Sequence, residues 1–321
     1  MIRILCVTIT IFSFFLQHSI AQSDTLFLKA KSGDGIISLL KRHNLDPDYY
    51  VDTFKKQNAD KLIDNKHLIL GETYMLAIET LTEDSISKAT KIVEDSLLLG
   101  AVIYIISGHG GPDPGAITII EGHTISEDEY AYDICLRLKY EILKHSGEAK
   151  MIIHDPNDSI RNDRILEIDI DEVCYPNLEI PYNHTKRLVQ RADAVNDLYS
   201  EKAANSYQRV IVVHLDSRSK GQTVDVFFYH YPGSKKGKTF ANNLKDVFAE
   251  KYAEHQPNRG YEGTVSGRNL LVLRKTLPPA AFVELANIKN SHNQKRFLDP
   301  DNRQALAKWL CEGIIRDFNS E

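Results

Sequence analysis

One short apolar segment in the first third of the chain places the strongest limit on the fold. Residues 101–106 form an unbroken apolar run between Gly100 and Ser107-Gly108, as expected of a strand covered on both faces. Strand-like and helix-like patterns then alternate, with strands expected at residues 149–153, 209–213, 224–229, 269–273 and 280–285 and helices at 127–145, 186–204, 238–253 and 303–318. This alternation predicts an α/β domain with a mostly parallel central sheet flanked by helices.

The first 21 residues have the pattern of an export signal. Arg3 precedes an apolar run over residues 4–16, which is followed by Ser19-Ile20-Ala21. We therefore expect a signal peptide over residues 1–21 and cleavage before Gln22. The apolar run is too short to span a bilayer, although an uncleaved anchor or a buried strand is the alternative. No later segment predicts a membrane span, so an exported protein is expected.

Composition argues against nucleic acid and anionic lipid as partners. Without Arg3, the 39 Lys and Arg residues fall to 38 against 44 Asp and Glu, a net charge of about −6. A mildly acidic chain lacks the basic surface that such partners require. Cys6 lies in the signal, and the three remaining cysteines are too few and too widely spaced for a disulfide framework. Cys135 and Cys311 are expected in the core. One disulfide between two of the three cysteines Cys135, Cys174 and Cys311 is possible, and the sequence does not indicate which two.

The chain is expected to divide into a small unit, a linker and a large domain. The boundaries predicted from composition and pattern are residues 22–80 for the small unit, 81–98 for the linker and 99–321 for the large domain. Charged residues dominate the linker, which is expected to be helical or irregular.

The small unit has a layout typical of an α+β fold. A strand, the turn Gly33-Asp34-Gly35, two helices, Asn58 and a final strand follow one another, and Asp34 is a good helix cap. This order resembles a LysM-like module, a domain type that binds glycans containing N-acetylglucosamine, although Gly35 stands where Thr is usual. A small spacer without affinity for carbohydrate is the alternative, because likeness of fold does not establish binding.

Four polar residues stand at the ends of predicted elements in the large domain. Glu127 opens a helix, and the other three follow or end strands: His109, His214 and Glu284. Ligands gather beyond the carboxyl ends of strands in open α/β sheets, so these side chains are expected at one rim. Two imidazoles and one carboxylate suit a catalytic zinc site, and a second carboxylate can transfer protons. Residue chemistry alone leaves open which glutamate has which role.

Ordered motifs over residues 100–318 add a resemblance to a known family. The segment 106–116 reads Ile-Ser-Gly-His-Gly-Gly-Pro-Asp-Pro-Gly-Ala, and Glu127 is followed by Leu136-Arg137-Leu138-Lys139. Later motifs are Arg191 to Asn196, Val212 to Asp216, Leu270 to Arg274, and the pair Val283-Glu284. In this order they resemble the zinc-dependent N-acetylmuramoyl-L-alanine amidases of the Amidase_3 type.

The resemblance implies roles for the four residues. His109, Glu127 and His214 would bind one Zn²⁺ ion, and Glu284 would be the catalytic carboxylate. The implied reaction is hydrolysis of the amide bond between the lactyl group of N-acetylmuramic acid and the L-alanine of the stem peptide. The implied partners are peptidoglycan glycan strands and stem peptides, which places the exported protein in the periplasm or at the cell envelope.

Some features depart from the family pattern or extend it. Ile106 replaces an Asp that would orient the first histidine, so another residue must take that role. Asp216 and Arg274 are weaker candidates for substrate binding. The chain between His214 and Glu284 is short and lacks a long helical insertion, so no obligate activator protein is expected.

An acidic segment over residues 155–175 allows two interpretations. It carries seven acidic residues against two basic ones, which is typical of a solvated loop. The alternative is a lid or specificity loop that offers Glu167 or Asp169 as an inhibitory ligand. Two other functions also fit the sequence: a non-catalytic peptidoglycan-binding protein on an amidase fold, and a zinc peptidase that cuts within the stem peptide.

Overall fold

The computed structural model describes residues 24–31, 33–43, 47–64, 66–78, 93–156, 158–202, 206–215 and 225–321. They belong to two compact units, Met1–Thr90 and Lys91–Glu321. The predicted signal peptide, most of the predicted linker and the candidate Asp216 lie outside the described residues. No helix among the described residues combines the length and apolarity needed to cross a membrane.

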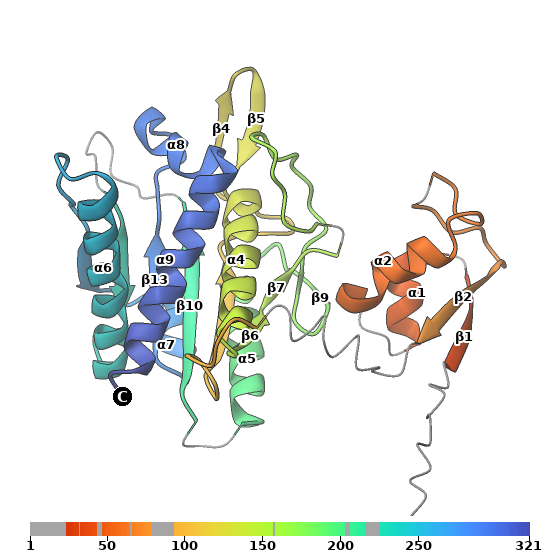
Figure 1. The fold of residues 1–321 in the computed structure, drawn as a ribbon, viewed down its shortest axis with the longest axis horizontal. Helices are drawn as coiled ribbons and strands as arrows, with labels where there is room; N and C mark the ends of the chain where they lie inside the picture. Colours follow the sequence, from red (N-terminus) through yellow and green to blue (C-terminus); the bar gives the residue numbers. More distant parts are fainter. Residues whose placement is uncertain are drawn as a thin grey trace, which may run out of the picture. The chain divides into compact units, whose positions relative to one another are not determined.

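The first unit has the order strand, helix, helix, strand that its sequence predicts. Strand β1 (Asp24–Lys29) pairs antiparallel with β2 (Thr73–Ile78), and helices α1 (Ile36–Arg42) and α2 (Pro47–Gln57) lie between them in sequence (Figure 1). Their buried side chains form one small core: Leu28, Ala30, Ile36, Leu39, Leu40, Phe54, Leu62, Tyr74 and Leu76.

Asn58 fixes the end of α2 to β2 in this unit. Its amide nitrogen donates to the carbonyls of Phe54 (2.8 Å) and Met75 (2.7 Å), and its amide oxygen accepts from the backbone nitrogen of Met75 (2.9 Å). The side chain is buried, so these bonds satisfy groups that would otherwise be costly to bury. The asparagine noted in the sequence therefore has a structural role.

A six-stranded sheet forms the centre of the second unit. Its strand order is β12-β11-β13-β10-β3-β6. All neighbours are parallel except the antiparallel pair β11 and β13, which confirms the predicted mostly parallel α/β fold. The strands are β3 (Val102–Ser107), β6 (Glu148–Met151), β10 (Gln208–His214), β11 (Phe227–His230), β12 (Thr264–Gly267) and β13 (Ala280–Glu284).

Helices cover both faces of this sheet (Figure 1). Ile103 and Ile105 face a core shared with α4 (Glu127–Lys144), α6 (Lys235–His255) and α9 (Pro300–Phe318). Tyr104 and Ile106 face the opposite core, formed with α5 (His184–Ser200) and α7 (Leu271–Lys275). Every residue of β3 is buried, which explains why this strand is apolar at every position rather than alternating.

Two parts of the element prediction are wrong or incomplete. Residues 269–273 were expected to form a strand, but Leu271–Lys275 is the helix α7, which buries Val272 and Leu273. A short apolar run does not distinguish a buried strand from a buried helical turn. The short, mostly polar helix α8 (Ser291–Leu298) and the largely exposed edge strand β12 were not predicted, because each contains few apolar residues.

Smaller elements complete the second unit. A hairpin of β4 (Ile117–Ile120) and β5 (His123–Ser126) precedes α4, and β7 (Ile153–His154), β8 (Val173–Cys174) and β9 (Leu178–Glu179) form a three-stranded sheet.

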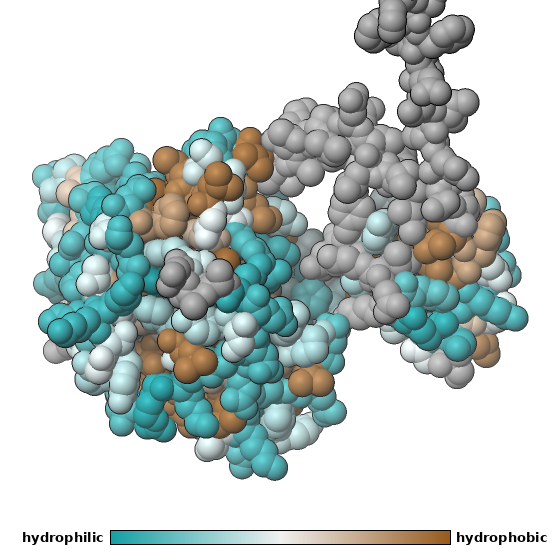
Figure 2. Space-filling model, turned by 90° about the horizontal axis from the view of Figure 1, so that it is seen from below, coloured by the Kyte–Doolittle hydropathy of each residue, from teal (hydrophilic) through white to brown (hydrophobic). Residues whose placement is uncertain are grey.

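The cysteines lie in the core, and the surface of the second unit is mostly hydrophilic on the face drawn in Figure 2. Cys135, Cys174 and Cys311 are buried free thiols, so the two cysteines predicted for the core lie there. On the face drawn in Figure 2, apolar side chains of the second unit stand in separate groups among hydrophilic ones.

Candidate metal centre

His109 lies in a tight turn directly after β3. Its backbone φ is 64°, a left-handed conformation that is uncommon for a residue with a side chain and is often found at functional sites. Gly108 makes the close approach to His214 possible, since a Cβ there would lie 2.5 Å from Nδ1 of His214. The turn therefore brings the two imidazoles together, with ring centroids 4.8 Å apart and planes at 82°.

Glu127 lies between these two histidines. It is the first residue of α4 and is 1% exposed. Its Oε2 lies 3.2 Å from Nε2 of His109, and its Oε1 lies 2.9 Å from Nδ1 of His214. The backbone nitrogens of Ala116 (3.1 Å) and Leu215 (3.0 Å) donate to the same carboxylate. These contacts fix both carboxylate oxygens toward the imidazoles.

His214 ends β10 and packs on the neighbouring strand. Its ring stacks on Phe282 of β13, with centroids 4.4 Å apart and planes at 15°. Because β3, β10 and β13 are parallel and adjacent, His214 reaches the same edge as the His109 turn. His109 and His214 therefore lie together at the carboxyl ends of the strands, as the sequence predicts.

Asp113 orients His109 in place of the residue missing at Ile106. Nδ1 of His109 donates to Oδ2 of Asp113 (3.0 Å), and the Arg187 guanidinium donates to the same oxygen (2.6 Å). Arg191, which is buried, donates to the His109 carbonyl. Such partners fix the tautomer and the direction of a ligand histidine. Asp113 and Arg191 lie in quoted motifs, but their contacts depend on the fold of the turn.

The pKa shifts of His109 and Glu127 favour a positive charge beside the Glu127 carboxylate, whereas burial disfavours a proton on His214. Burial would lower the pKa of His109, but its hydrogen bonds with Asp113 and Glu127 raise the pKa to about 9. Burial would raise the pKa of Glu127, but hydrogen bonds to both histidines hold the pKa well below its usual value. Burial lowers the pKa of His214. A metal ion competes with the proton for such ligands.

The donor set fits a zinc ion. One atom from each of His109, Glu127 and His214 lies within 4.8 Å of the other two. Two nitrogens and one carboxylate oxygen match the ligands of catalytic zinc sites. At Gly115 a Cβ would lie 2.6 Å from the His109 ring and 2.8 Å from Oε2 of Glu127, so this position needs a residue without a side chain.

Glu284 lines the same cleft as the three donors. The cleft has a volume of about 740 Å³. Glu284 is the last residue of β13 and pairs in register with His214 of β10. Paired residues of adjacent strands point to the same face of a sheet, so both side chains leave the sheet on one side.

The cleft also contains basic and aromatic side chains that the sequence did not single out. They are His184, Arg187, Arg268, Lys289, Phe227, Tyr229 and Phe282, and Arg191 of the quoted motif lines the cleft with them. The candidate Arg274 is not among the lining residues; it is exposed and donates to Asn269 (2.9 Å). A periodicity argument has no means of identifying Arg268, which lies in the loop after an edge strand.

The fold and the site together define an α/β enzyme domain with a metal-type donor set at the carboxyl edge of its sheet. The chain belongs to the Amidase_3 family of N-acetylmuramoyl-L-alanine amidases, whose family model matches residues 103–316. The family and the enzyme class predicted from the motifs are thereby confirmed.

Individual relatives are distant. The germination-specific N-acetylmuramoyl-L-alanine amidase of Bacillus subtilis is 24% identical over 70% of this chain and 82% of its own length. The probable cell wall amidase LytH of Staphylococcus epidermidis is 23% identical over 72% of this chain, and the match spans 63% of that relative, less than two thirds of it.

Two solved structures share the fold. An N-acetylmuramoyl-L-alanine amidase from Clostridium difficile 630 is 16% identical, with a TM-score of 0.50 over 69% of this chain and 98% of the other. The CwlD amidase of Clostridioides difficile, solved in complex with the GerS lipoprotein, is 18% identical, with a TM-score of 0.50 over 68% and 99%.

Proposed function

We propose that this protein hydrolyses the amide bond between the lactyl group of N-acetylmuramic acid and the L-alanine of the stem peptide in peptidoglycan. The observation that carries the proposal is the Glu127 carboxylate held between His109 and His214 at the end of the sheet. These three residues would hold one zinc ion. When bound, zinc polarises an amide carbonyl and lowers the pKa of water to about 7.

Glu284 would transfer the protons of the reaction. It lines the cleft on the strand adjacent to His214, and the Glu127 carboxylate is already occupied by two imidazoles and two backbone nitrogens. In the proposed reaction Glu284 accepts a proton from the attacking water and delivers it to the departing L-alanine amine. Glu127 and Glu284 thereby take the separate roles that residue chemistry left open.

Asp113 would keep His109 in its working orientation. Its carboxylate accepts from Nδ1 of the ring, so Nε2 is directed toward Glu127 and the proposed metal. Arg187 holds the Asp113 carboxylate from the other side. This contact removes the reason for favouring a non-catalytic binding protein, which was the absence of an acidic residue at Ile106.

Arg268 is a better candidate for substrate binding than Arg274. Arg268 lines the cleft, and its guanidinium lies over the ring of Tyr229, 4.8 Å from the centroid. A guanidinium fixed by an aromatic ring is suited to binding a carboxylate, which is the charged group of a stem peptide. Phe282 and Tyr229 supply an apolar wall beside it.

The first unit would attach the enzyme to its polymer. We base this on its strand-helix-helix-strand fold and the LysM-like order of its sequence. The signal over residues 1–21 would direct the protein out of the cytoplasm to the periplasm or cell envelope. The proposed layout is then a signal, a glycan-binding module, a linker and the zinc amidase domain.

The decisive experiment is mass spectrometry of purified peptidoglycan digested with residues 22–321. Stem peptides with free L-alanine amino termini, lost on chelation and restored by zinc, would support the proposal. Cleavage within the stem would instead indicate a peptidase. If a folded, zinc-loaded protein cleaves nothing, either it needs an activator protein or it only binds peptidoglycan. A partner protein is a relevant control, since the CwlD amidase was solved in complex with GerS.

A further inference from the structure

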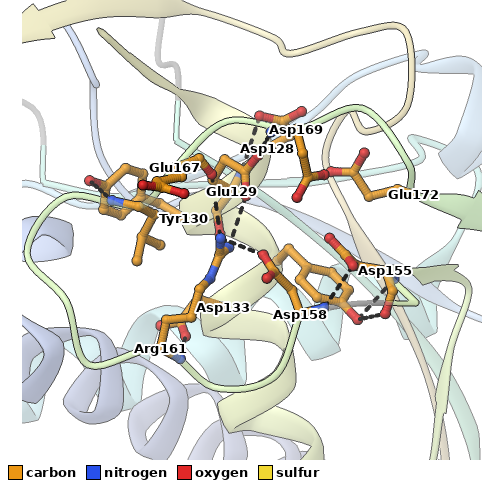
Figure 3. Close-up of polar contacts among 12 residues, drawn as sticks. Asp128, Glu129, Tyr130, Asp133, Asp155, Asp158, Arg161, Glu167, Asp169 and Glu172 are labelled. Carbon is orange, nitrogen blue, oxygen red and sulfur yellow. Dashed lines mark hydrogen bonds and ion pairs between the residues drawn. The ribbon is translucent and has the colours of Figure 1, made fainter. Parts of the chain in front are cut away.

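A second group of carboxylates lies behind the proposed zinc site, at the start of α4. Asp128 and Glu129 follow Glu127 directly, and Glu172 comes from the acidic segment before β8. They are 1%, 1% and 4% exposed. One oxygen of each lies within 4.8 Å of the other two. Figure 3 shows these carboxylates converging from the helix and the segment. None of them lines the zinc cleft.

The three carboxylates have too few basic partners to balance their negative charge. Arg161 pairs with Glu129 (2.9 Å) and also with Asp158. Within the part of the chain that the structure describes, neither Asp128 nor Glu172 forms an ion pair with a lysine or arginine. The other buried arginines nearby, Arg137 and Arg303, are bound to Asp133 (Figure 3 labels Asp133 and Arg161).

Asp128 has a buried oxygen without a partner. Oδ1 accepts from the backbone nitrogen of Glu129 (3.0 Å), but Oδ2 makes no hydrogen bond within the described structure. Burial raises the pKa of Asp128, and the nearby Ser126 hydroxyl lowers it by favouring the charged form, but this hydroxyl does not meet hydrogen-bond geometry. A buried carboxylate oxygen without a donor is unfavourable, because it has lost its water without gaining a partner. Buried polar atoms of this kind call for an explanation such as an ion.

Further acidic residues of the same segment strengthen the negative potential. Oxygens of Asp155, Asp169 and Asp171 lie within 4.8 Å of one another. The backbone nitrogen of Asp169 donates to Glu129 (2.9 Å), which joins this second set to the first (Figure 3). The two acidic sets therefore lie side by side, and Arg161 forms its ion pairs with Glu129 of the first set and with Asp158.

We infer that Asp128, Glu129 and Glu172 bind a divalent cation of the calcium type, at a site separate from the proposed zinc centre. The donors are all carboxylate oxygens, which hard cations such as Ca²⁺ prefer, whereas zinc favours nitrogen and sulfur. Each of the three carboxylates offers one oxygen to a common ion, and Ca²⁺ commonly completes its coordination shell with further oxygens, including waters. The cation would give Asp128 Oδ2 its partner and neutralise the charge that Arg161 leaves uncompensated.

The position of this site gives the acidic segment a structural role. Oε2 of Glu172 accepts from the backbone nitrogen of Gly111 (2.6 Å), two residues after His109. A cation on Glu172 would therefore join the acidic segment, the start of α4 and the turn that carries His109. The inhibitory ligands considered from sequence, Glu167 and Asp169, do not line the zinc cleft.

The test is calcium binding by the full chain after its zinc site has been saturated. Isothermal titration calorimetry with CaCl₂ is expected to show one binding event, and thermal denaturation is expected to show a higher unfolding temperature with Ca²⁺ than without it. Asp128→Asn and Glu172→Gln are each expected to weaken binding at least ~10-fold. Each should stay folded in calcium-free buffer, because neutralising one carboxylate relieves repulsion. Glu167→Gln, in the same acidic segment but exposed, is the matched control and should bind like the wild type.

The inference is wrong if the zinc-saturated wild type shows neither heat nor thermal shift up to ~10 mM Ca²⁺, above the range of weak extracellular calcium modules. Binding of equal strength in both variants would also overturn it, since the ion would then lie elsewhere. Neither result depends on hydrolysis, so the inference fails or survives independently of the proposed amidase mechanism.

Discussion

At the residue scale, the site depends on side chains held by backbone geometry. His109 has a left-handed backbone conformation between Gly108 and Gly110. Both ring nitrogens have partners, Asp113 at Nδ1 and Glu127 at Nε2. The motifs predicted which residues would be metal ligands. They did not predict that Asp113 orients the ring, because that contact requires the turn to fold back over four residues.

Removing the carboxylate of Glu284 should separate metal binding from turnover. Glu284→Gln keeps the size of the side chain and leaves His109, Glu127 and His214 intact. We expect unchanged zinc content and a fall in kcat of at least ~100-fold, the usual contribution of a positioned acid–base group. Zinc analysis and peptidoglycan digestion measure the two effects. Glu254→Gln, on the exposed face of α6, is the control, and full turnover in Glu284→Gln would exclude the role.

Asp113→Asn tests the orientation of His109. The amide oxygen can still accept from the ring, but the charge that holds the imidazole and pairs with Arg187 is lost. We expect zinc affinity to fall about 10–100-fold, as for other changes behind a ligand histidine. Competition with a chromophoric chelator measures this. Asp163→Asn, an exposed change, should have no effect, and equal affinities for both variants would contradict the assignment.

Gly108→Ala tests the close approach of the two histidines. The new Cβ would lie 2.5 Å from the His214 ring, so the ring or the turn must shift, at a cost of about 1–3 kcal/mol of stability. We expect a lower unfolding temperature and weaker zinc binding. In Gly35→Ala the Cβ meets no atom within 4 Å, which makes it the matched control. A Gly108→Ala protein with wild-type stability would show that the turn is more adaptable than its geometry indicates.

At the element scale, the acidic segment and α4 form one structural unit. Arg161 and Asp169 of the segment both bind Glu129, and Glu172 binds Gly111. The sequence predicted an excursion rich in acidic residues but not its place, because a segment without apolar periodicity gives no information about which element it packs against. The strands β3, β10 and β13 were predicted well because they are buried on both faces.

Burial of Glu172 predicts a pH dependence of stability. Burial, followed by the nearby Asp128 charge, raises the pKa of Glu172 to about 8 from its usual value of 4.5. Between these pH values the unfolded chain has lost the proton while the folded chain retains it, so the free energy of unfolding falls as the pH rises from 4.5 to 8. In calcium-free buffer, Glu172→Gln should show a smaller fall in unfolding temperature over this window than the wild type. Parallel curves for the two proteins would contradict the prediction.

At the scale of the whole molecule, two units with separate cores divide recognition from chemistry in the proposed function. The core of the first unit is formed by its own strands and helices, and the second contains the complete candidate site. The order of elements was predictable from sequence in the first unit and for the buried strands and long helices of the second, but not for α7, α8 and β12. The proposed substrate contact Arg268 was not predictable, since it lies in a loop whose path depends on the completed sheet.

Deleting residues 22–78 should therefore affect attachment more than hydrolysis. We expect the shortened protein to cleave small soluble muropeptides at the wild-type rate and to sediment less with intact peptidoglycan sacculi. Sedimentation and product analysis measure the two properties. Equal sedimentation of both proteins would rule out glycan binding by the first unit and favour the spacer interpretation.

The register between β10 and β13 has a consequence for how this enzyme can change. His214 and Glu284 are opposite one another on adjacent parallel strands, so their separation is set by the sheet rather than by any loop. Loops before and after these strands can lengthen without disturbing the pair. Inserting or deleting one residue within β13 would instead turn Glu284 to the other face of the sheet, toward α4 and α6. Variation in substrate preference is therefore expected in loop length, whereas the length of these two strands should stay fixed.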